Sequence, residues 1–323
     1  MPARREAWLL TVHGLDEFPE GGPGSALALG TFDGLHLGHQ AVIGEAVARA
    51  RGGLRSVVVT FEPLPLEVLR PSLEPVLLTT LDERLPLLAR LGVDLTVVLR
   101  FDLTFAQTPA EVWLDEVLGR RFGARAVYAG SSYTFGHRRE GTAARVAEWG
   151  RARGVEVHLA PAVLVRGEPL SSSRIRSALR EGLVDEAAQL LGRYYSVSGQ
   201  VVPGQGRGRT LGYPTANLQP ASPRKLLPAR GVYATIAGVR GRRYGGATNI
   251  GFRPTFGGTH LAVETFLLEF DGDLVGEEMR VDFVGRIRAE RAFPGPEALA
   301  RQIGEDLARV RELLAGAPPG IIH

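Results

Sequence analysis

Short apolar runs alternate with amphipathic stretches of helical spacing through residues 25–160. The apolar runs have the length of buried strands, and we predict five of them, at Ala26–Phe32, Ser56–Phe61, Leu95–Arg100, Ala126–Ala129 and Glu156–Leu159. The stretches between them predict four helices, at His36–Ala50, Leu81–Leu91, Pro109–Phe122 and Glu140–Arg153. Such alternation is typical of right-handed βαβ units, so this part is predicted to be α/β, with a parallel sheet covered on both faces.

The pattern changes after two further predicted helices, Ser173–Glu181 and Val184–Leu191. Between Tyr195 and Val284, Gly- and Pro-rich turns separate strand-like segments, which predicts an antiparallel sheet or a small closed barrel. A last helix is predicted at Pro296–Leu314, because one stripe gathers its apolar residues: Leu299, Ile303, Leu307, Val310 and Leu314. We expect the boundary between two domains near residues 182–195.

Amino-acid composition limits the classes of protein to which this chain can belong. A chain of 323 residues, 44% of them hydrophobic, is long enough for two domains with buried cores. The absence of cysteine excludes disulfides, thiolate metal sites and thiol catalysis. No apolar run approaches the length of a membrane span, and the first residues are too weakly apolar for a secretory signal, so a cytoplasmic protein is expected.

The charge pattern further limits the partners and the phosphate-binding motifs that can be expected. Acidic residues are interspersed almost one for one with the basic ones, the net charge is only +3, and no dense basic run predicts a nucleic-acid partner. All but one of the 38 Lys and Arg residues are arginine, and Lys225 is the exception. Because no G-x-x-x-x-G-K-[ST] loop exists, any kinase chemistry must hold phosphates without a P-loop lysine.

The most informative stretch of the first half is GTFDGLHLGH, from Gly30 to His39. A strand meets a tight turn there, and a helix then carries His36 and His39 three residues apart, on one face of its first turn. Free N–H groups and the helix dipole favour an anion at this end, and two imidazoles suit the phosphates of a nucleotide. In parallel sheets, ligands bind beyond the carboxyl ends of the strands, where this turn falls. A single histidine is usually structural, but strand, glycine turn and histidine pair together favour a site.

A second constellation lies in GQVVPGQGRGRTLGYPTANL, residues 199–218. Gly204, Gly206 and Gly208 are spaced like a dinucleotide fingerprint, but no helix can follow through the sequence LGYP, so that interpretation fails. Two alternatives remain: a glycine loop whose N–H groups and arginines surround phosphates, and a plain glycine-rich hairpin.

Glu264 bears on that choice. In a strand through Ala262–Phe270, alternation puts Glu264 on the same side as three apolar residues, Phe266, Leu268 and Phe270. A carboxylate on such a face is either buried, and suited to take a proton from a hydroxyl, or a solvated or paired structural residue. Thr215 and Asn217 add oxygen ligands of the kind that Mg²⁺ accepts beside phosphate and water.

Over almost its whole length the sequence resembles the prokaryotic bifunctional riboflavin kinase/FMN adenylyltransferases, or FAD synthetases. The first half carries GTFDGLHLGHQAVI, TFEP, YTFGHRREG and LSSSRIRSAL, the last continuing into EGLVDEAAQLLGR. The second half carries GRTLGYPTANL, LLPARGVYAT, ATNIGFRPTF, VETFLLEF and RAERAF. The resemblance implies a Rossmann-like nucleotidyltransferase domain at residues 1–185, and at residues 186–323 a riboflavin kinase domain, a small antiparallel β-barrel followed by a helix.

Two successive reactions are implied. The kinase moves the γ-phosphoryl group of ATP to the ribityl hydroxyl of riboflavin and forms FMN. The adenylyltransferase moves AMP from a second ATP onto FMN and releases pyrophosphate, forming FAD. The implied cofactor is Mg²⁺, with ATP as substrate and FMN and FAD as products. The expected partners are therefore small molecules, without nucleic acid or membrane, and the oligomeric state is left open, with a monomer among the alternatives.

Family roles carry over to matching residues. His36 and His39 would hold the ATP phosphates and stabilise the α-phosphoryl transition state, and Arg176 would grip the leaving pyrophosphate. Glu264 would be the base of the kinase, and Thr215 and Asn217 would position Mg²⁺ and phosphates. Further ATP- and phosphate-binding positions are Gly30, Phe32, Asp33, Gly38, Ser171, Ser172, Gly206, Gly208, Arg209 and Gly212.

Two departures from the family pattern lie in the first half. Leu64 stands where the family commonly has His, and Ser132 where it commonly has Asp or Asn. They motivate one alternative, a riboflavin kinase with weak or lost adenylyltransferase activity, since leucine makes no side-chain hydrogen bond. Another alternative is a non-catalytic flavin- or RNA-binding module, against which the intact His36, His39 and Glu264 argue.

Overall fold

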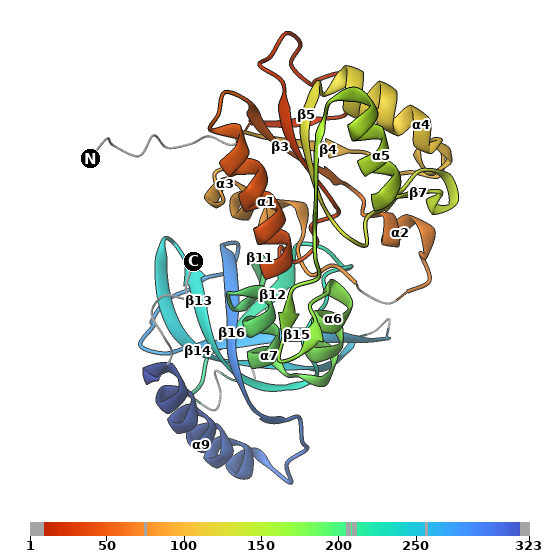
Figure 1. Cartoon of the computed structure of the whole chain (residues 1–323). Coiled ribbons are helices and arrows are strands. Elements are labelled where there is room, and N and C mark those ends of the chain that lie inside the picture. The colour runs from red at the N-terminus through yellow and green to blue at the C-terminus, as the bar shows by residue number, and fades with distance from the viewer. Residues whose placement is uncertain (1–9, 74–75, 205–207, 209–211, 256–257, 317–323) are drawn as a thin grey trace, which may run out of the picture. The chain divides into compact units, whose positions relative to one another are not determined.

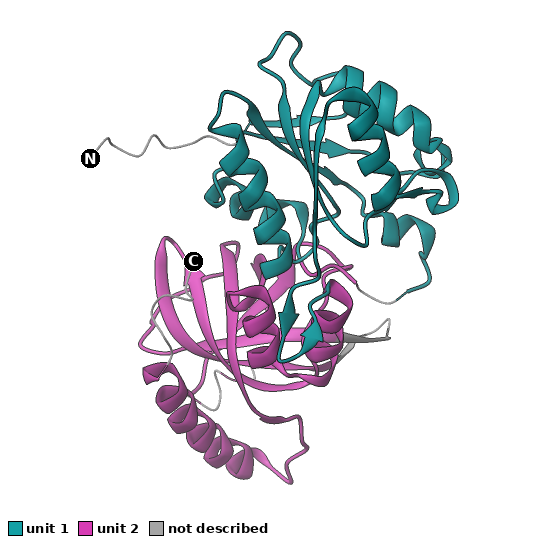
Figure 2. Ribbon diagram, viewed as in Figure 1, with its two compact units in different colours: residues 1–74, 79–171 teal, residues 75–78, 172–323 magenta. Residues whose placement is uncertain are grey.

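The computed structural model describes residues 10–73, 76–204, 208, 212–255 and 258–316. The chain forms two compact units, shown in different colours in Figure 2. Unit 1 comprises residues 1–74 and 79–171, and unit 2 comprises residues 75–78 and 172–323. The compact units therefore divide at residue 171, and the predicted boundary between the two activities at residue 185 stays a prediction.

Unit 1 contains the predicted parallel sheet. Its six strands run in the spatial order β1-β4-β3-β2-β5-β8, and every pair is parallel. Their bounds are β1 Leu10–His13, β2 Ser25–Leu29, β3 Arg55–Phe61, β4 Leu95–Leu99, β5 Ala124–Gly130 and β8 Glu156–Ala160. All five predicted strands are present. The sixth, β1, was not predicted, because its four residues contain a single buried position, Val12.

Helices cover both faces of this sheet (Figure 1). On β2, Ala26 and Ala28 face α1 (Leu37–Ala50) and α3 (Leu81–Arg90), whereas Leu27 and Leu29 face the opposite core. That second core is closed by α4 (Ala110–Val112), its π-helical continuation η2 (Trp113–Arg121) and α5 (Ala143–Arg153). Strands buried on both faces read as unbroken apolar runs, which is why the sequence pattern identified them. The smaller elements of unit 1 are α2 Pro65–Leu69, η1 Phe105–Gln107, β6 Thr134–Phe135, η3 His137–Arg139, β7 Gly141–Thr142, β9 Leu164–Val165 and β10 Glu168–Pro169.

The chain leaves β2 in a tight turn at the centre of the sheet. β2 pairs with β3 on one side and β5 on the other, so the strand order reverses here, and the crevice at such a switch point is where ligands bind. The predicted strand Ala26–Phe32 is too long, since β2 ends at Leu29. The reason is left-handed backbone in the turn, with φ of 51° at Phe32, 81° at Gly34 and 43° at Leu35.

Unit 2 is built on a closed antiparallel barrel, as predicted. Its strands follow the order β11-β12-β15-β14-β13-β16 around the barrel. Their bounds are β11 Tyr195–Val202, β12 Ala216–Pro220, β13 Gly231–Val239, β14 Arg242–Thr255, β15 Gly258–Leu267 and β16 Glu278–Ala289. Closure removes the unpaired strand edges that an open sheet of this size would leave.

The interior of the barrel includes a row of hydroxyl groups. The Thr235 and Thr248 oxygens lie 2.8 Å apart, Thr248 and Thr265 lie 2.9 Å apart, and Thr235 also donates to the Gly246 carbonyl at 3.1 Å. All three threonines are fully buried, so each hydroxyl needs the partner that this row provides. Because Thr265 points inward, the adjacent Glu264 lies on the outer face of β15.

Among the described residues, α6 (Ser172–Glu181), α7 (Val184–Leu191) and α9 (Pro296–Ala315) accompany the barrel. α6 packs on α7, α7 packs on β11 and β16, and α9 packs on β13, β14 and β16. Residues 76–78 also belong to this unit, and the Lys225 ammonium donates to the Leu78 carbonyl at 2.7 Å. Lys225 is buried and lies 4.7 Å from the centroid of the Tyr195 ring, which gives the single lysine a structural contact. None of the helices in the described residues combines the length and apolar character that crossing a bilayer requires.

Candidate active sites

The two histidines of unit 1 lie against each other at the start of α1. The rings of His36 and His39 are stacked, with centroids 3.6 Å apart and planes 18° apart. His36 caps the helix, because its Nδ1 accepts a hydrogen bond from the backbone N–H of His39 at 3.3 Å. A neutral His36 therefore carries its proton on Nε2, which leaves Nε2 as a donor. The prediction that the spacing brings both imidazoles to one face is confirmed.

Glycines make room for this pair. A Cβ atom at Gly38 would stand 3.2 Å from Cε1 of His36, and one at Gly30 would stand 3.0 Å from the Phe32 ring. The Phe32 ring in turn meets His39 edge to face, with centroids 5.3 Å apart. The first turn of α1 contains no acidic residue, so no carboxylate of that turn opposes the positive end of the helix dipole.

Asp33 closes the turn that carries the histidines. It is 1% exposed, and its Oδ1 accepts a hydrogen bond from the backbone N–H of Thr79 at 2.9 Å. The Thr79 hydroxyl accepts one from the N–H of Gly34 at 3.0 Å. Beyond the neighbouring strands, Leu64 is buried at the start of α2, and Ser132 is exposed just after β5.

The residues predicted to hold pyrophosphate are divided between the two units. Ser171 ends unit 1, whereas Ser172 and Arg176 on α6 belong to unit 2. Within unit 2, Nε of Arg176 donates to the Val76 carbonyl at 2.7 Å. The proposed grip on pyrophosphate stays a prediction.

In unit 2 the strand register surrounds Glu264 with amides. Glu264 on β15 is directly opposite Asn217 on β12 and, on its other side, Asn249 on β14. Residues directly opposite one another in a sheet share a face, so the three side chains form one row on the outside of the barrel. Asn217 is buried and Glu264 is half-buried. We call this the Asn–Glu–Asn row.

Gly204 and Gly208 lie close to Asn217 and Thr215. A Cβ at Gly204 would stand 2.1 Å from Nδ2 of Asn217, and one at Gly208 would stand 3.5 Å from Oγ1 of Thr215. Glycine at these two positions therefore allows the backbone to come close to the side chains of Asn217 and Thr215. Gly212 has the left-handed φ of 81° and makes a turn before Thr215. Gly206 and Arg209 lie outside the described residues.

Asn249 is a member of the row that the sequence interpretation did not identify. A Cβ at Gly251 would stand 3.1 Å from Nδ2 of Asn249 and 2.4 Å from Oε1 of Glu290, so a second carboxylate lies next to that amide. The motif ATNIG gave Asn249 as a family match only. Its place beside Glu264 depends on strand register, which no spacing along the chain specifies.

The oxygen atoms of the Asn–Glu–Asn row and of the neighbouring Thr215 are of the kind that bind a hard cation. A hydroxyl at Thr215, an amide oxygen at Asn217 and a carboxylate at Glu264 are the oxygen ligands that Mg²⁺ takes together with phosphates and water. A cluster of three or more His, Cys, Asp and Glu side chains that could hold a metal by itself is not found among the described residues. Such a partial set suits Mg²⁺ that arrives with a nucleotide rather than a permanent metal centre.

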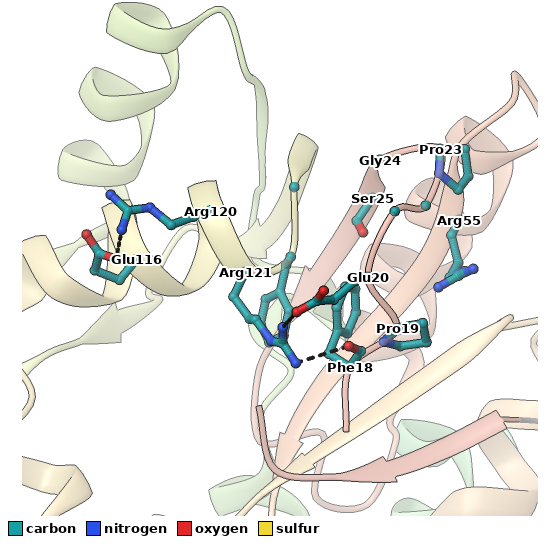
Figure 3. A pocket seen from close by; sticks show the side chains of 14 residues that line it. Phe18, Pro19, Glu20, Pro23, Gly24, Ser25, Arg55, Glu116, Arg120 and Arg121 are labelled. Carbon is teal, nitrogen blue, oxygen red and sulfur yellow. Dashed lines mark hydrogen bonds and ion pairs between the residues drawn. The ribbon is translucent and has the colours of Figure 1, made fainter. Parts of the chain in front are cut away.

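A cavity of about 570 Å³ lies at the opposite, amino-terminal edge of the sheet, beside Ser25, Arg55 and Gly123 (Figure 3). Two of the three arginines that line it are already engaged: Arg121 pairs with Glu20 at 3.0 Å, and Arg120 pairs with Glu116 at 2.9 Å. Exposed pairs of this kind leave little charge for an anion. We therefore assign no chemistry to this cavity.

Comparison with known proteins matches the two parts of the chain to two different families. A family model of FAD synthetase matches residues 19–174, and one of riboflavin kinase matches residues 191–314. A crystal structure from Streptococcus pneumoniae, described as a macrolide-efflux protein, matches with a TM-score of 0.84 at 32% identity, covering 94% of this chain and 99% of that one.

Curated relatives match over nearly the full length. The bifunctional riboflavin kinase/FMN adenylyltransferase of Listeria monocytogenes is 37% identical over 292 residues, which cover 90% of this chain and 92% of the relative. The protein of the same name from Escherichia coli is 34% identical over 310 residues, covering 95% and 98%. The chain belongs to the bifunctional riboflavin kinase/FMN adenylyltransferase family.

Proposed function

We propose that unit 1 adenylylates FMN through His36 and His39, and that unit 2 phosphorylates riboflavin through Glu264. Together the two reactions convert riboflavin into FAD at the expense of two ATP molecules. The proposal is supported by two sets of side chains of different chemistry. Unit 1 has stacked imidazoles at its switch point, and unit 2 has a carboxylate between two amides. Since both steps consume ATP, we propose the cytoplasm as the place of this work.

In adenylyl transfer, a phosphate oxygen of FMN attacks the α-phosphorus of ATP. The bond from that phosphorus to the bridging oxygen breaks, and pyrophosphate leaves with the bonding electrons. Negative charge on the α-phosphoryl oxygens must be neutralised, and donors placed in advance do this at little reorganisation cost. His36 through Nε2, His39 and the first-turn N–H groups of α1 are proposed as those donors, and Arg176, Ser171 and Ser172 as the clamp on pyrophosphate.

In the kinase step, the ribityl hydroxyl of riboflavin attacks the γ-phosphorus of ATP and ADP leaves. The hydroxyl proton passes to Glu264, and Asn217 and Asn249 on either side hold the carboxylate in place. Thr215 and Asn217 are the residues that would hold Mg²⁺, which when bound neutralises phosphate charge. The N–H groups of the glycine loop, including Gly208 and Gly212, would surround the phosphates.

Substitution of one group in each unit tests the division of labour. Glu264→Gln is expected to abolish FMN formation from riboflavin and Mg-ATP, because the amide accepts no proton at the hydroxyl, while FAD formation from supplied FMN continues. His39→Ala should do the reverse, since only the α-phosphoryl charge loses a donor. Chromatography of products after each incubation gives both rates.

The same assay separates the alternatives. If the unmodified chain forms no FAD and no pyrophosphate from FMN, it is a riboflavin kinase only. Survival of both rates in the two variants would favour a binding module, and loss of both rates in either folded variant would contradict one site per unit.

A pair of glycines on α1 offers a matched test of His36. Gly38→Ala adds a methyl group about 3.2 Å from the His36 ring, whereas Gly44→Ala adds one where no atom lies within 4 Å. Both changes favour the helix by roughly 1 kcal/mol. We expect Gly38→Ala to lower kcat for FAD formation about tenfold by displacing the ring, and Gly44→Ala to leave it unchanged. Equal rates in both variants would contradict a role for His36.

Two glycines of the barrel test Asn217 in the same way. A methyl group at Gly204 would stand 2.1 Å from the Asn217 amide, but one at Gly238 meets only a carbonyl oxygen at 4.0 Å. Gly204→Ala should therefore displace the amide and lower the rate of FMN formation about tenfold to 100-fold. Gly238→Ala serves as the control, and FAD formation from FMN should be normal in both. An unchanged kinase rate in Gly204→Ala would remove Asn217 from the site.

A further inference from the structure

A charged side chain lies in the core of unit 1, directly below the candidate nucleotide site. Arg84, on the second turn of α3, has no exposed surface at all. Burying a guanidinium is unfavourable unless its N–H groups find acceptors and its charge finds counter-charges. The position of those acceptors therefore indicates what this residue does.

The acceptors belong to two different segments. One Nη donates to the Thr60 hydroxyl at 2.9 Å and the Phe61 carbonyl at 3.3 Å, both at the end of β3. The other Nη donates to the Thr79 carbonyl at 3.4 Å, just before α3 begins. A forked guanidinium can serve both segments at once, which a lysine ammonium does less well.

Two of the three accepting residues, Thr60 and Thr79, are themselves bonded to the turn that leads to the histidines. The Thr60 hydroxyl donates to the Thr31 carbonyl at 2.9 Å. Thr79 donates from its N–H to Asp33, and its hydroxyl accepts from the N–H of Gly34. Arg84 is thus one residue removed from both sides of the turn between β2 and α1.

The charges agree with these contacts. Burial lowers the pKa of Arg84, and the carboxylates of Asp33 and Glu62 oppose that change. Burial likewise raises the pKa of Glu62, which Arg84 counteracts. The guanidinium is therefore held by carboxylates that lie just after the ends of β2 and β3, two neighbouring strands of the sheet.

We propose that Arg84 is a positioning residue for adenylyl transfer. It fixes the turn at residues 31–34, whose left-handed backbone is unfavourable for Phe32, so that His36 and His39 are placed before ATP arrives. This inference rests on the proposed role of the two histidines. It predicts an effect on the rate of FAD formation that loss of stability alone does not produce.

The test compares Arg84→Lys, Arg84→Met and Thr60→Val with Arg90→Met, a control on the exposed side of the same helix. For each full-length chain, kcat and the KM for ATP are measured for FAD formation from FMN. Circular dichroism and thermal unfolding report whether unit 1 is folded, and riboflavin phosphorylation reports the integrity of unit 2. Arg84→Met should lose about 100-fold in kcat with a much smaller change in KM, and Arg84→Lys and Thr60→Val about tenfold. Arg90→Met should match the unmodified chain.

A folded Arg84→Met chain with normal kcat would overturn the proposal, whatever its melting temperature. If that variant does not fold, normal kcat in Arg84→Lys and Thr60→Val overturns it instead. His39→Ala is assayed alongside. Activity retained in His39→Ala would refute the proposed function, whereas an inactive His39→Ala beside active Arg84 variants would refute only the positioning role.

Discussion

Strand pairing is the constraint on which both sites depend. In unit 1, β2 pairs with β3 and β5, so the turn after β2 lies at the reversal of strand order. In unit 2, the antiparallel register places Asn217 and Asn249 on either side of Glu264. A shift of one residue in β15 would turn Glu264 into the barrel and bring Thr265 out. The chemistry of each unit therefore follows from hydrogen bonds between backbones.

Buried polar groups also favour this strand register, because they find their hydrogen-bond partners only when the strands pair in this way. The hydroxyl row of Thr235, Thr248 and Thr265 joins β13, β14 and β15 inside the barrel, and a slipped strand would leave hydroxyls without partners. In unit 1, Arg84 instead joins the end of β3 to Thr79, which is bonded to the turn after β2. An unpaired buried polar group costs about 1–3 kcal/mol, and a buried charge more. These groups add specificity rather than a large net stability.

The sequence was sufficient for the parts of the fold that follow from periodicity. The two-sided burial of β2 through β5 and the apolar stripe of the last helix are local patterns, and they predicted those elements. The turn after β2 was predicted, but the strand was extended too far, to Phe32. The left-handed backbone there accompanies contacts from Thr79, 46 residues from Asp33 along the chain. Strand β15 was extended to Phe270 for a similar reason, since the left-handed Glu269 ends it after Leu267.

Of the sites, the sequence could predict the groups that stand within one turn of each other, such as His36 and His39. It could not predict Asn249 or Arg84. Asn249 reaches Glu264 only through pairing of β14 with β15, and Arg84 is one of many arginines in a chain whose basic residues are almost all arginine. What distinguishes Arg84 is complete burial, a property of the folded unit.

The two proposed sites offer opposite kinds of group, hydrogen-bond donors in unit 1 and a proton acceptor in unit 2. This difference follows from their proposed nucleophiles. FMN brings a phosphate that is already ionised near neutral pH, so its adenylylation needs no base, and unit 1 provides donors: two imidazoles and the N–H groups of a helix. Riboflavin brings an alcohol, which must lose a proton as it attacks, so unit 2 provides an acceptor, Glu264, held between amides that cannot ionise. An imidazole pair without an acceptor would leave the alcohol protonated. One ATP-dependent site could not meet both requirements, which gives a physical reason for two units in one chain.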